Sequence, residues 1–403
     1  MPSRRLLFLI AACAVGASPA PAADAPLGLP AVGEAFHAQL VGVSPAGKLR
    51  FSGGGAPGEL PLADLALWGA FVEPSQGPQI VLADGSLIVV DSLRIEKEQV
   101  RATSSLLGKI TLPLDLVAGI VFRPPLDLAI RDQLRGRMLA TTGETDRVLL
   151  DNGDELTGTI VGLDDAKAEP VLQLQSDVGK TEIPADKLAA ILFNATLVNK
   201  PRTSGLRTVV GMRDGSRVIS TELSSDKAGA RLKLADGVTL QLSWEAIVAL
   251  QILDGRAVYL SDLKPASYRH IPYLQLSWPF QTDRSVLGSQ LRVGGSIYAK
   301  GLGMHSPARI TYDLDQPYRR FQAEVAVDRE AQQRGSVVFR VFTDDGGGTW
   351  QERAASEVLR GGAPPQPISV DLTGAKKISL LVDFADHGDE LDHADWLNAR
   401  LLR

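Results

Sequence analysis

Apolar and polar residues alternate with a period of two along the C-terminal third of the chain. This period is typical of strands that bury one face. The alternating segments are 310–314, 321–327, 337–341, 368–372 and 378–384. Glycine, proline and aspartate separate them, so we predict an antiparallel β-sandwich.

The first two-thirds of the chain repeats one pattern, at a spacing of about 60 to 70 residues. Each copy begins with a strand, a D-G or N-G turn and a second strand, which predicts a β-hairpin. The copies begin "VLADGSLIVVDSLRI" at Val81, "VLLDNGDELTGTIVGL" at Val148 and "VVGMRDGSRVISTEL" at Val209. Each continues with two short strands and a closing phrase that ends at Phe122, Phe193 or Leu253. A degenerate copy precedes them, with "HAQLVGV" and "GELPLADLALWGAF".

Units of about five short, bent strands close most readily into small barrels, because closure removes their exposed edges. By strand order and hairpin style the units resemble Sm-like small β-barrels, a resemblance that concerns the fold alone. The predicted fold class is therefore all-β, with tandem small β-barrel repeats followed by a sandwich. The expected divisions are a signal peptide at 1–23, a degenerate repeat at 24–75, repeats at 76–123, 148–200 and 201–255, a helical linker at 124–147 and the sandwich at 256–403.

One helix interrupts the repeats. Pro124 and Pro125 stand at its start, and the apolar residues Leu126, Ile130, Leu134 and Met138 follow at intervals of four. This spacing predicts one apolar face, which we expect to pack between barrels as a strut.

The N-terminus predicts export. Two arginines precede an apolar run at residues 6–15, and small residues follow up to Ala22, as in a secretory signal peptide cleaved near Ala22 or Ala23. The run is about half the roughly 20 residues of a membrane-spanning helix. "SRRLL" also resembles a twin-arginine signal, and "IAAC" resembles a lipoprotein box that would acylate Cys13. Cys13 is the single cysteine, so its removal would leave no disulfide or thiolate metal site.

Composition excludes some partners. The 403 residues carry a formal net charge of -5, and acidic and basic residues are interspersed. No basic patch suited to nucleic acid or to an anionic membrane is present in this pattern. We therefore expect no nucleic-acid partner and no transmembrane segment in the mature chain.

Several C-terminal phrases follow one family pattern in order: "VYLSDLKPASY", "YAKGLGMHSPARITYDL", "FQAEVAVDRE", "GSVVFRVFTDDG", "ISVDLTGAKKISLLV" and "DHADWLNARL". They resemble the NPCBM domain, a family named for carbohydrate binding that accompanies glycoside hydrolases such as family 98. The resemblance covers about residues 256–403. It implies a jelly-roll sandwich, similar to carbohydrate-binding module family 51, that binds galactose-containing glycans. Carbohydrate is thus the expected partner.

Four residues of this region are candidate ligand contacts: His305, Trp350, His393 and Asp395. His305 is predicted to lie in a turn made by Gly301 and Gly303. There its imidazole either packs and forms hydrogen bonds within the protein at the rim, or bonds a sugar hydroxyl. Trp350 ends a glycine-rich tip and could stack on a sugar ring. By strand alternation Trp396 points into the core. Tyr268, Tyr273 and Trp278 are second-choice candidates.

An acidic loop precedes the last predicted strand and holds Asp383, Asp386, Asp389, Glu390, Asp392 and Asp395. Carboxylates at this density are either solvated or bound to a hard cation such as calcium. The candidate calcium ligands are Asp386, Asp389 and Asp392, and we expect the loop to approach the turn that holds His305. His387 and His393 could suggest zinc, but no third ligand has the characteristic spacing.

The chain contains no G-x-S-x-G, H-E-x-x-H, P-loop or Rossmann fingerprint. We therefore predict an exported, non-catalytic protein that binds carbohydrate. One alternative is a structural or adhesive cell-envelope protein whose repeats contact envelope proteins. A second alternative is a glycoside hydrolase, or an accessory subunit of one, which would need two positioned carboxylates.

Overall fold

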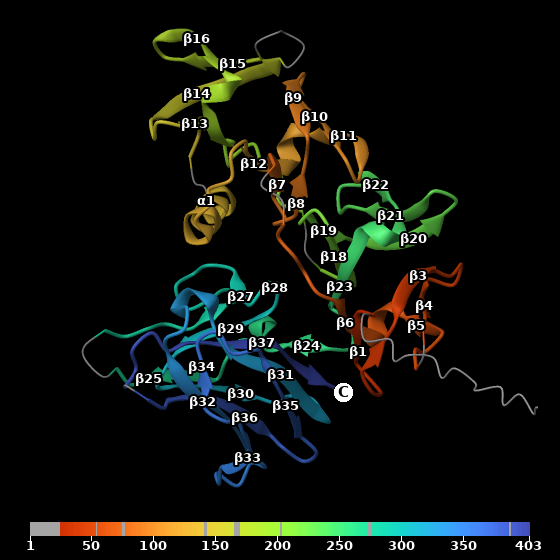
Figure 1. Cartoon of the computed structure of the whole chain (residues 1–403), viewed down its shortest axis with the longest axis vertical. Coiled ribbons are helices and arrows are strands. Elements are labelled where there is room, and N and C mark those ends of the chain that lie inside the picture. Colours follow the sequence, from red (N-terminus) through yellow and green to blue (C-terminus); the bar gives the residue numbers. More distant parts are fainter. Residues whose placement is uncertain are drawn as a thin grey trace, which may run out of the picture.

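The computed structural model describes residues 25–53, 55–74, 77–140, 143–164, 170–201, 204–272, 276–386 and 388–403. The predictions for the signal peptide, Cys13, Tyr273 and His387 fall outside these residues. The described chain is built from strands β1 to β37 and one α-helix (Figure 1). The all-β fold class is confirmed.

Four repeats form an N-terminal array. The first holds β1 (Leu27–Pro30), β2 (Phe36–His37), β3 (Gln39–Val43), β4 (Lys48–Ser52), β5 (Glu59–Pro61) and β6 (Leu65–Gly69). The second holds β7 (Gln79–Leu82), β8 (Leu87–Val89), β9 (Ser92–Glu96), β10 (Gln99–Ser104), β11 (Gly108–Pro113) and β12 (Val117–Val121). The third holds β13 (Asp146–Leu150), β14 (Glu155–Asp164), β15 (Val171–Ser176), β16 (Gly179–Pro184) and β17 (Leu188–Leu192). The fourth holds β18 (Arg207–Met212), β19 (Arg217–Ser220), β20 (Glu222–Asp226), β21 (Gly229–Lys233), β22 (Thr239–Leu242) and β23 (Ile247–Leu253).

The predicted hairpins are present at all three D-G and N-G turns. They join β7 to β8, β13 to β14 and β18 to β19. Gly85, Gly153 and Gly215 have φ angles of 91°, 92° and 92°, a region that favours glycine. A short 3₁₀ turn precedes the last strand of every repeat, the degenerate one included; these turns are η1 (Leu62–Asp64), η2 (Leu114–Leu116), η3 (Ala185–Lys187) and η4 (Trp244–Ala246).

The repeats do not close into the small barrels that we predicted. In each repeat the last strand pairs with the first, as β12 does with β7 and β23 does with β18. Among the described residues, no ladder joins the next-to-last strand of a repeat to its last strand. The last strands instead pair between repeats, β6 with β23 and β12 with β17. A neighbouring repeat thus covers the free edge of the last strand, whereas β5, β11, β16 and β22 pair on one side only in the described residues.

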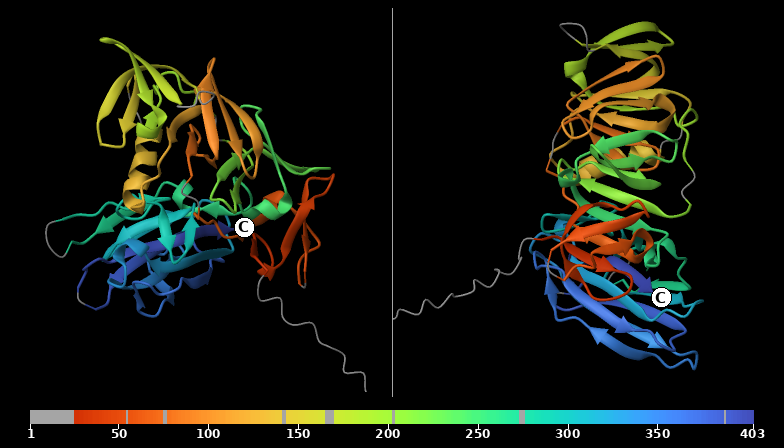
Figure 2. Two further views of the ribbon diagram at one scale, coloured as in Figure 1. Left: turned by 45° about the horizontal axis from the view of Figure 1, so that its top comes forward. Right: turned by 90° about the vertical axis from the view of Figure 1, so that its right-hand side faces the viewer.

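These ladders give the array a spatial order that differs from the chain order. The first repeat adjoins the fourth through β6 and β23, and the fourth adjoins the second through β19 and β8. The second adjoins the third through β12 and β17 and through β9 and β14. Figure 2 shows the repeats following one another in this order above the C-terminal sandwich.

Helix α1 (Leu128–Ala140) corrects the predicted apolar stripe. Leu134 and Met138 are buried, but Leu126 and Ile130 are 78% and 56% exposed. The buried face also contains Arg131, Asp132 and Arg135. Ion pairs, described below, allow these charged side chains to be buried in place of apolar ones.

The C-terminal part is a sandwich of two sheets, as predicted. One sheet has the order β26 (Gln281–Thr282), β29 (Gly301–His305), β37 (His393–Leu402), β31 (Arg320–Val327) and β35 (Gln366–Asp371), with β24 (Val258–Tyr259) also beside β37. The other has the order β25 (Ser267–His270), β30 (Ala308–Asp313), β36 (Lys377–Phe384), β32 (Ser336–Asp344) and β33 (Gln351–Ala355), with β34 (Leu359–Arg360) beside β32. The remaining elements are the hairpin of β27 (Leu291–Val293) and β28 (Ser296–Tyr298) and the 3₁₀ turns η5 (Leu260–Asp262) and η6 (Arg329–Ala331).

The sandwich core contains the alternating apolar residues of both sheets. Trp396 is completely buried in it, as predicted, and its ring meets that of Phe339 edge to face at a centroid distance of 5.0 Å. Strands predicted from period-two alternation all lie in this sandwich, because each has one face toward this core.

The array packs directly on the sandwich. The Ile297 N–H of β28 donates to the Phe71 carbonyl, at 3.1 Å, and the Tyr259 hydroxyl donates to the Ala66 carbonyl, at 3.0 Å. Phe71, Tyr259 and Ile297 belong to one buried apolar cluster. Hydrogen bonds and apolar contacts therefore fix the two parts against each other.

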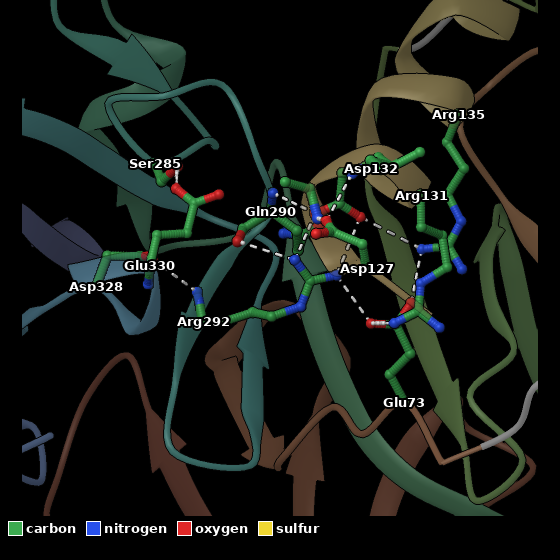
Figure 3. A network of polar contacts seen from close by, with 12 residues as sticks. Glu73, Asp127, Arg131, Asp132, Arg135, Ser285, Gln290, Arg292, Asp328 and Glu330 are labelled. Carbon is green, nitrogen blue, oxygen red and sulfur yellow. Dashed lines mark hydrogen bonds and ion pairs between the residues drawn. The ribbon is translucent and has the colours of Figure 1, made fainter. Parts of the chain in front are cut away.

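A buried ion network crosses the same junction (Figure 3). Arg292 of β27 pairs with Asp132 of α1 and, at 2.8 Å, with Glu73, which follows the first repeat. Glu73 also pairs with Arg135 at 2.7 Å and Arg131 at 3.1 Å. The network thus joins the array, the helix and the sandwich through side chains that are at most 9% exposed.

Candidate functional site

His305 ends a strand and does not lie in the glycine turn that we predicted. Gly301 and Gly303 belong to β29, where they pair with Leu397 and Asp395 of β37. A Cβ on Gly303 would lie 2.4 Å from the Arg284 carbonyl oxygen. Close packing of the segment around Arg284 therefore requires this glycine, because any side chain would collide with backbone.

Two of the four predicted ligand residues come together at the sandwich rim. His305 and His393 are register partners on β29 and β37, and their ring centroids are 5.8 Å apart. After His305 the chain crosses from one sheet to the other, through Ser306 and Pro307 into β30. The pair therefore lies at an end of the sandwich, where loops meet.

Trp278 and His270 complete this group, which we call the rim cluster: His270, Trp278, His305 and His393. The Trp278 and His305 rings are stacked, with centroids 5.0 Å apart and planes 7° apart. His270 meets His305 at 5.8 Å, nearly perpendicular to it. Trp278 remains partly exposed, so the cluster presents an aromatic surface to solvent.

Hydrogen bonds fix the segment that carries Trp278. The Tyr268 hydroxyl donates to the Trp278 carbonyl at 2.7 Å, and the Trp278 N–H donates to Nδ1 of His270 at 3.2 Å. Both partners belong to β25, a strand at the edge of the second sheet. The main chain of Trp278 is therefore held by regular structure although its own segment is irregular.

The buried imidazoles of the rim cluster are neutral near pH 7. Burial lowers the pKa of His305, and burial with the nearby His305 lowers the pKa of His393 to about 4. A neutral imidazole offers one N–H donor and one acceptor nitrogen. In His305 the Nδ1–H donates to the Ser306 carbonyl at 2.9 Å, which leaves Nε2 to accept a hydrogen bond from a hydroxyl.

Asp392 lies directly behind the cluster, as we expected for the acidic loop. Its carboxylate accepts hydrogen bonds from the Ser306 hydroxyl and, at 2.7 Å, from the Ser336 N–H. Asp392 is completely buried, and this burial raises its pKa to about 6. It therefore orders the turn that follows His305.

The other candidate calcium ligands have different surroundings. Asp386 pairs with Arg360 at 2.6 Å on the surface, whereas the Asp389 carbonyl accepts a bond from the Asp392 N–H at 3.4 Å. Among the described residues, no group of three or more histidine, cysteine, aspartate or glutamate side chains is arranged to hold a metal ion. Calcium binding stays a prediction.

The remaining two candidates are not part of the rim cluster. The Arg309 guanidinium lies 4.5 Å from the ring centroid of Trp350, on the outer side of the second sheet. Asp395 is completely buried, and burial together with the carboxylates of Asp328 and Glu330 raises its pKa well above the ordinary value of aspartate. Asp395 is thus inaccessible to a ligand at the surface.

Sequence reasoning gave Trp278 second place and missed His270. The aromatic density of the stretch from Tyr268 to Phe280 was an available signal. Its weakness is that only folding brings this stretch beside the ends of β29 and β37.

Residues 256–402, which form the sandwich, match the family model described as the NPCBM/NEW2 domain. A relative from Renibacterium salmoninarum named "Putative endo-alpha-N-acetylgalactosaminidase" is 35% identical over 115 residues, which are 28% of this chain and 7% of that protein. "Alpha-1,3-galactosidase B" of Akkermansia muciniphila is 29% identical over 120 residues, which are 29% of this chain and 14% of that protein. The chain thus spans a small part of these curated relatives.

Solved structures of two Clostridium perfringens proteins are also similar to this chain. The CBM51 of Clostridium perfringens GH95 in complex with methyl-galactose has 25% identity and a TM-score of 0.32, over 36% of this chain and 99% of that one. The CBM51-2 and INT domains of Clostridium perfringens ZmpB, solved with GlcNAc, have 29% identity and a TM-score of 0.33, over 49% of this chain and 37% of that one. Separately, no helix in the described part of the chain has the length and apolar character to cross a bilayer.

Proposed function

We propose that this is an exported, non-catalytic protein that binds carbohydrate at the rim cluster of its C-terminal sandwich. The observation that carries the proposal is the partly exposed Trp278, stacked on His305 beside two further histidines. A sugar ring has an apolar C–H face that packs on an aromatic ring, and its hydroxyls bond neutral imidazoles. The NPCBM match supports binding by this domain.

We infer a glycan with terminal galactose or N-acetylgalactosamine. Both curated relatives are named for enzymes that act on sugars of this type. Binding is favoured over hydrolysis because a glycosidase needs two positioned carboxylates, whereas Asp392, which lies behind the cluster, is completely buried. Export is inferred from the signal-peptide pattern of residues 1–23.

The test uses the mature chain on a glycan array, followed by calorimetry with the sugars that bind. Trp278→Ala and His305→Ala should each weaken binding by about tenfold or more, the equivalent of about 1.4 kcal/mol. Trp350→Ala is the matched control, since it removes a tryptophan from the outer side of the second sheet. Loss of sugar binding in Trp350→Ala, with binding retained in Trp278→Ala and His305→Ala, would place the site at Trp350 instead. Absence of binding of the native chain to galactosides and to the other glycans of the array would refute the proposal.

A second function, contact with envelope proteins, is favoured by one feature of the array. In the described residues, the next-to-last strands of the repeats, β5, β11, β16 and β22, each pair on one side only. A strand edge of this kind can accept a further strand from a partner. Capture of one defined protein by the mature chain, without competition by sugar, would support this function, and loss of that capture on adding sugar would contradict it.

A further inference from the structure

A second candidate ligand site lies between the array and the sandwich, in a cavity of about 340 Å³. One wall comes from the first and fourth repeats, with Leu67 of β6 and Val248 of β23. The facing wall comes from β28, β31 and β37 of the sandwich. Two hydrogen bonds join the two walls, each at 3.1 Å. The Ile297 N–H donates to the Phe71 carbonyl, and Gln251 Nε2 donates to Asn398 Oδ1.

The cavity wall is mostly apolar, with polar groups from the sandwich. The apolar side chains are those of Leu27, Leu29, Leu67, Phe71, Val248 and Ile297. Among the described residues that line the cavity, Glu324 is the one acidic or basic side chain, and Tyr298 and Asn398 accompany it. The lining therefore resembles a small-molecule pocket, in which an apolar wall surrounds a few polar groups.

Glu324 is the acidic group of the cavity wall. Burial raises its pKa, while Arg400 and a hydrogen bond from Asn398 act in the opposite direction. Burial raises the pKa of Tyr298 as well, and the negative charges of Glu324 and Asp395 add to this effect. Tyr298 therefore stays neutral, and the net charge of the cavity wall is negative when Glu324 is ionised.

We propose that this cavity binds a small organic cation with an apolar body, such as an alkylammonium or arylammonium ion. The ammonium group would pair with Glu324 and the face of Tyr298, and the body would pack against Phe71 and Ile297. The volume lies at the lower end of the roughly 300 to 1,000 Å³ of ligand pockets, which suits a small ligand. The site is separate from the rim cluster and does not depend on sugar binding there.

The experiment compares three probes of one shape by calorimetry on the full mature chain: phenethylammonium, phenethyl alcohol and 3-phenylpropionate. The cation should bind about tenfold or more tightly than the alcohol, and the anion should bind least. Glu324→Gln should make the cation and the alcohol equal. Glu352→Gln, on the exposed pair with Arg340, is the matched control and should leave the ratio unchanged.

A third variant tests the location. Leu67→Trp fills the cavity and should remove binding of the cation and the alcohol together, with the melting profile checking that the chain stays folded. Equal affinity of the native chain for the cation and the alcohol would overturn the proposal, as would an unchanged ratio in Glu324→Gln or no binding of any probe. Sugar binding should be the same in Glu324→Gln and in the native chain, so failure at this cavity is distinguishable from failure at the rim.

Discussion

Replacing Glu73 by glutamine should destabilise the junction between array and sandwich. The Glu73 carboxylate pairs with Arg135, Arg292 and Arg131 at 2.7, 2.8 and 3.1 Å, and its side chain is 9% exposed. Glutamine keeps the shape but removes the charge. Three buried guanidinium groups would then depend on Asp132 alone, and an uncompensated buried charge is costly.

The size of the effect follows from the pKa of Glu73. Burial by itself raises this pKa, but Arg135 and Arg292 outweigh burial and hold it at about 2, against an ordinary value of 4.5. A difference of this size corresponds to about 3 kcal/mol of stability. Because the pKa is lowered in the folded state, this stability is fully present above pH 4.5 and is lost as the pH falls toward 2.

The assay is denaturant unfolding of the mature native chain, Glu73→Gln and Glu352→Gln at pH 7, 4 and 2. At pH 7 Glu73→Gln should lower the free energy of unfolding by about 3 kcal/mol, and the difference from the native chain should shrink toward pH 2, where about half of the native Glu73 is protonated. The control breaks an exposed pair and should cost at most about 1 kcal/mol. A difference that is the same at all three pH values would refute the reasoning.

Three further predictions concern the sandwich. Trp396→Ala should lower the free energy of unfolding by about 3 to 5 kcal/mol in denaturant titrations, because the indole is completely buried, and a loss below about 1 kcal/mol would contradict this. Burial raises the pKa of Asp392 to about 6, so the contribution of Asp392 to stability should fall as the pH rises from 4 to 6, whereas the contribution of His393, whose pKa burial lowers to about 4, should rise; Asp392→Asn should therefore make stability increase more steeply with pH than in the native chain, and an unchanged slope would be the contrary result. If calcium binds at Asp386, Asp389 and Asp392, a hundredfold excess over Kd should add about 2.7 kcal/mol, with magnesium adding less, and equal melting temperatures in chelator, calcium and magnesium would exclude that site.

Local features of the fold were readable in the sequence. Period-two alternation gave the sandwich strands, and the D-G and N-G pairs gave the three hairpins. Both signals depend on residues that are near neighbours in the chain: one strand with its two faces, or one turn with its glycine. Burial of Trp396 followed from the same alternation.

The sequence was less informative where distant segments meet. An arginine that is buried in an ion pair has the same sequence pattern as an exposed arginine. The predicted buried face of α1 therefore contained Leu126 and Ile130, whereas the buried face in the structure contains Arg131 and Asp132. The prediction of closed barrels was wrong for the same reason, since it also depended on a contact between distant segments. Whether a last strand closes its own barrel or pairs with another repeat depends on which edge is nearby after folding, as for β12 and β17.

The candidate site was likewise predictable in part from the sequence. The sequence by itself determined that His305 and His393 belong to one domain rich in candidate contacts, because the NPCBM phrases surround them. Only the tertiary structure decided that these two residues share a register, that Trp278 stacks on one of them and that Asp395 is buried elsewhere. The physical reason is that a binding surface is defined by which side chains converge and remain exposed, and both properties depend on packing between strands that are far apart in the chain.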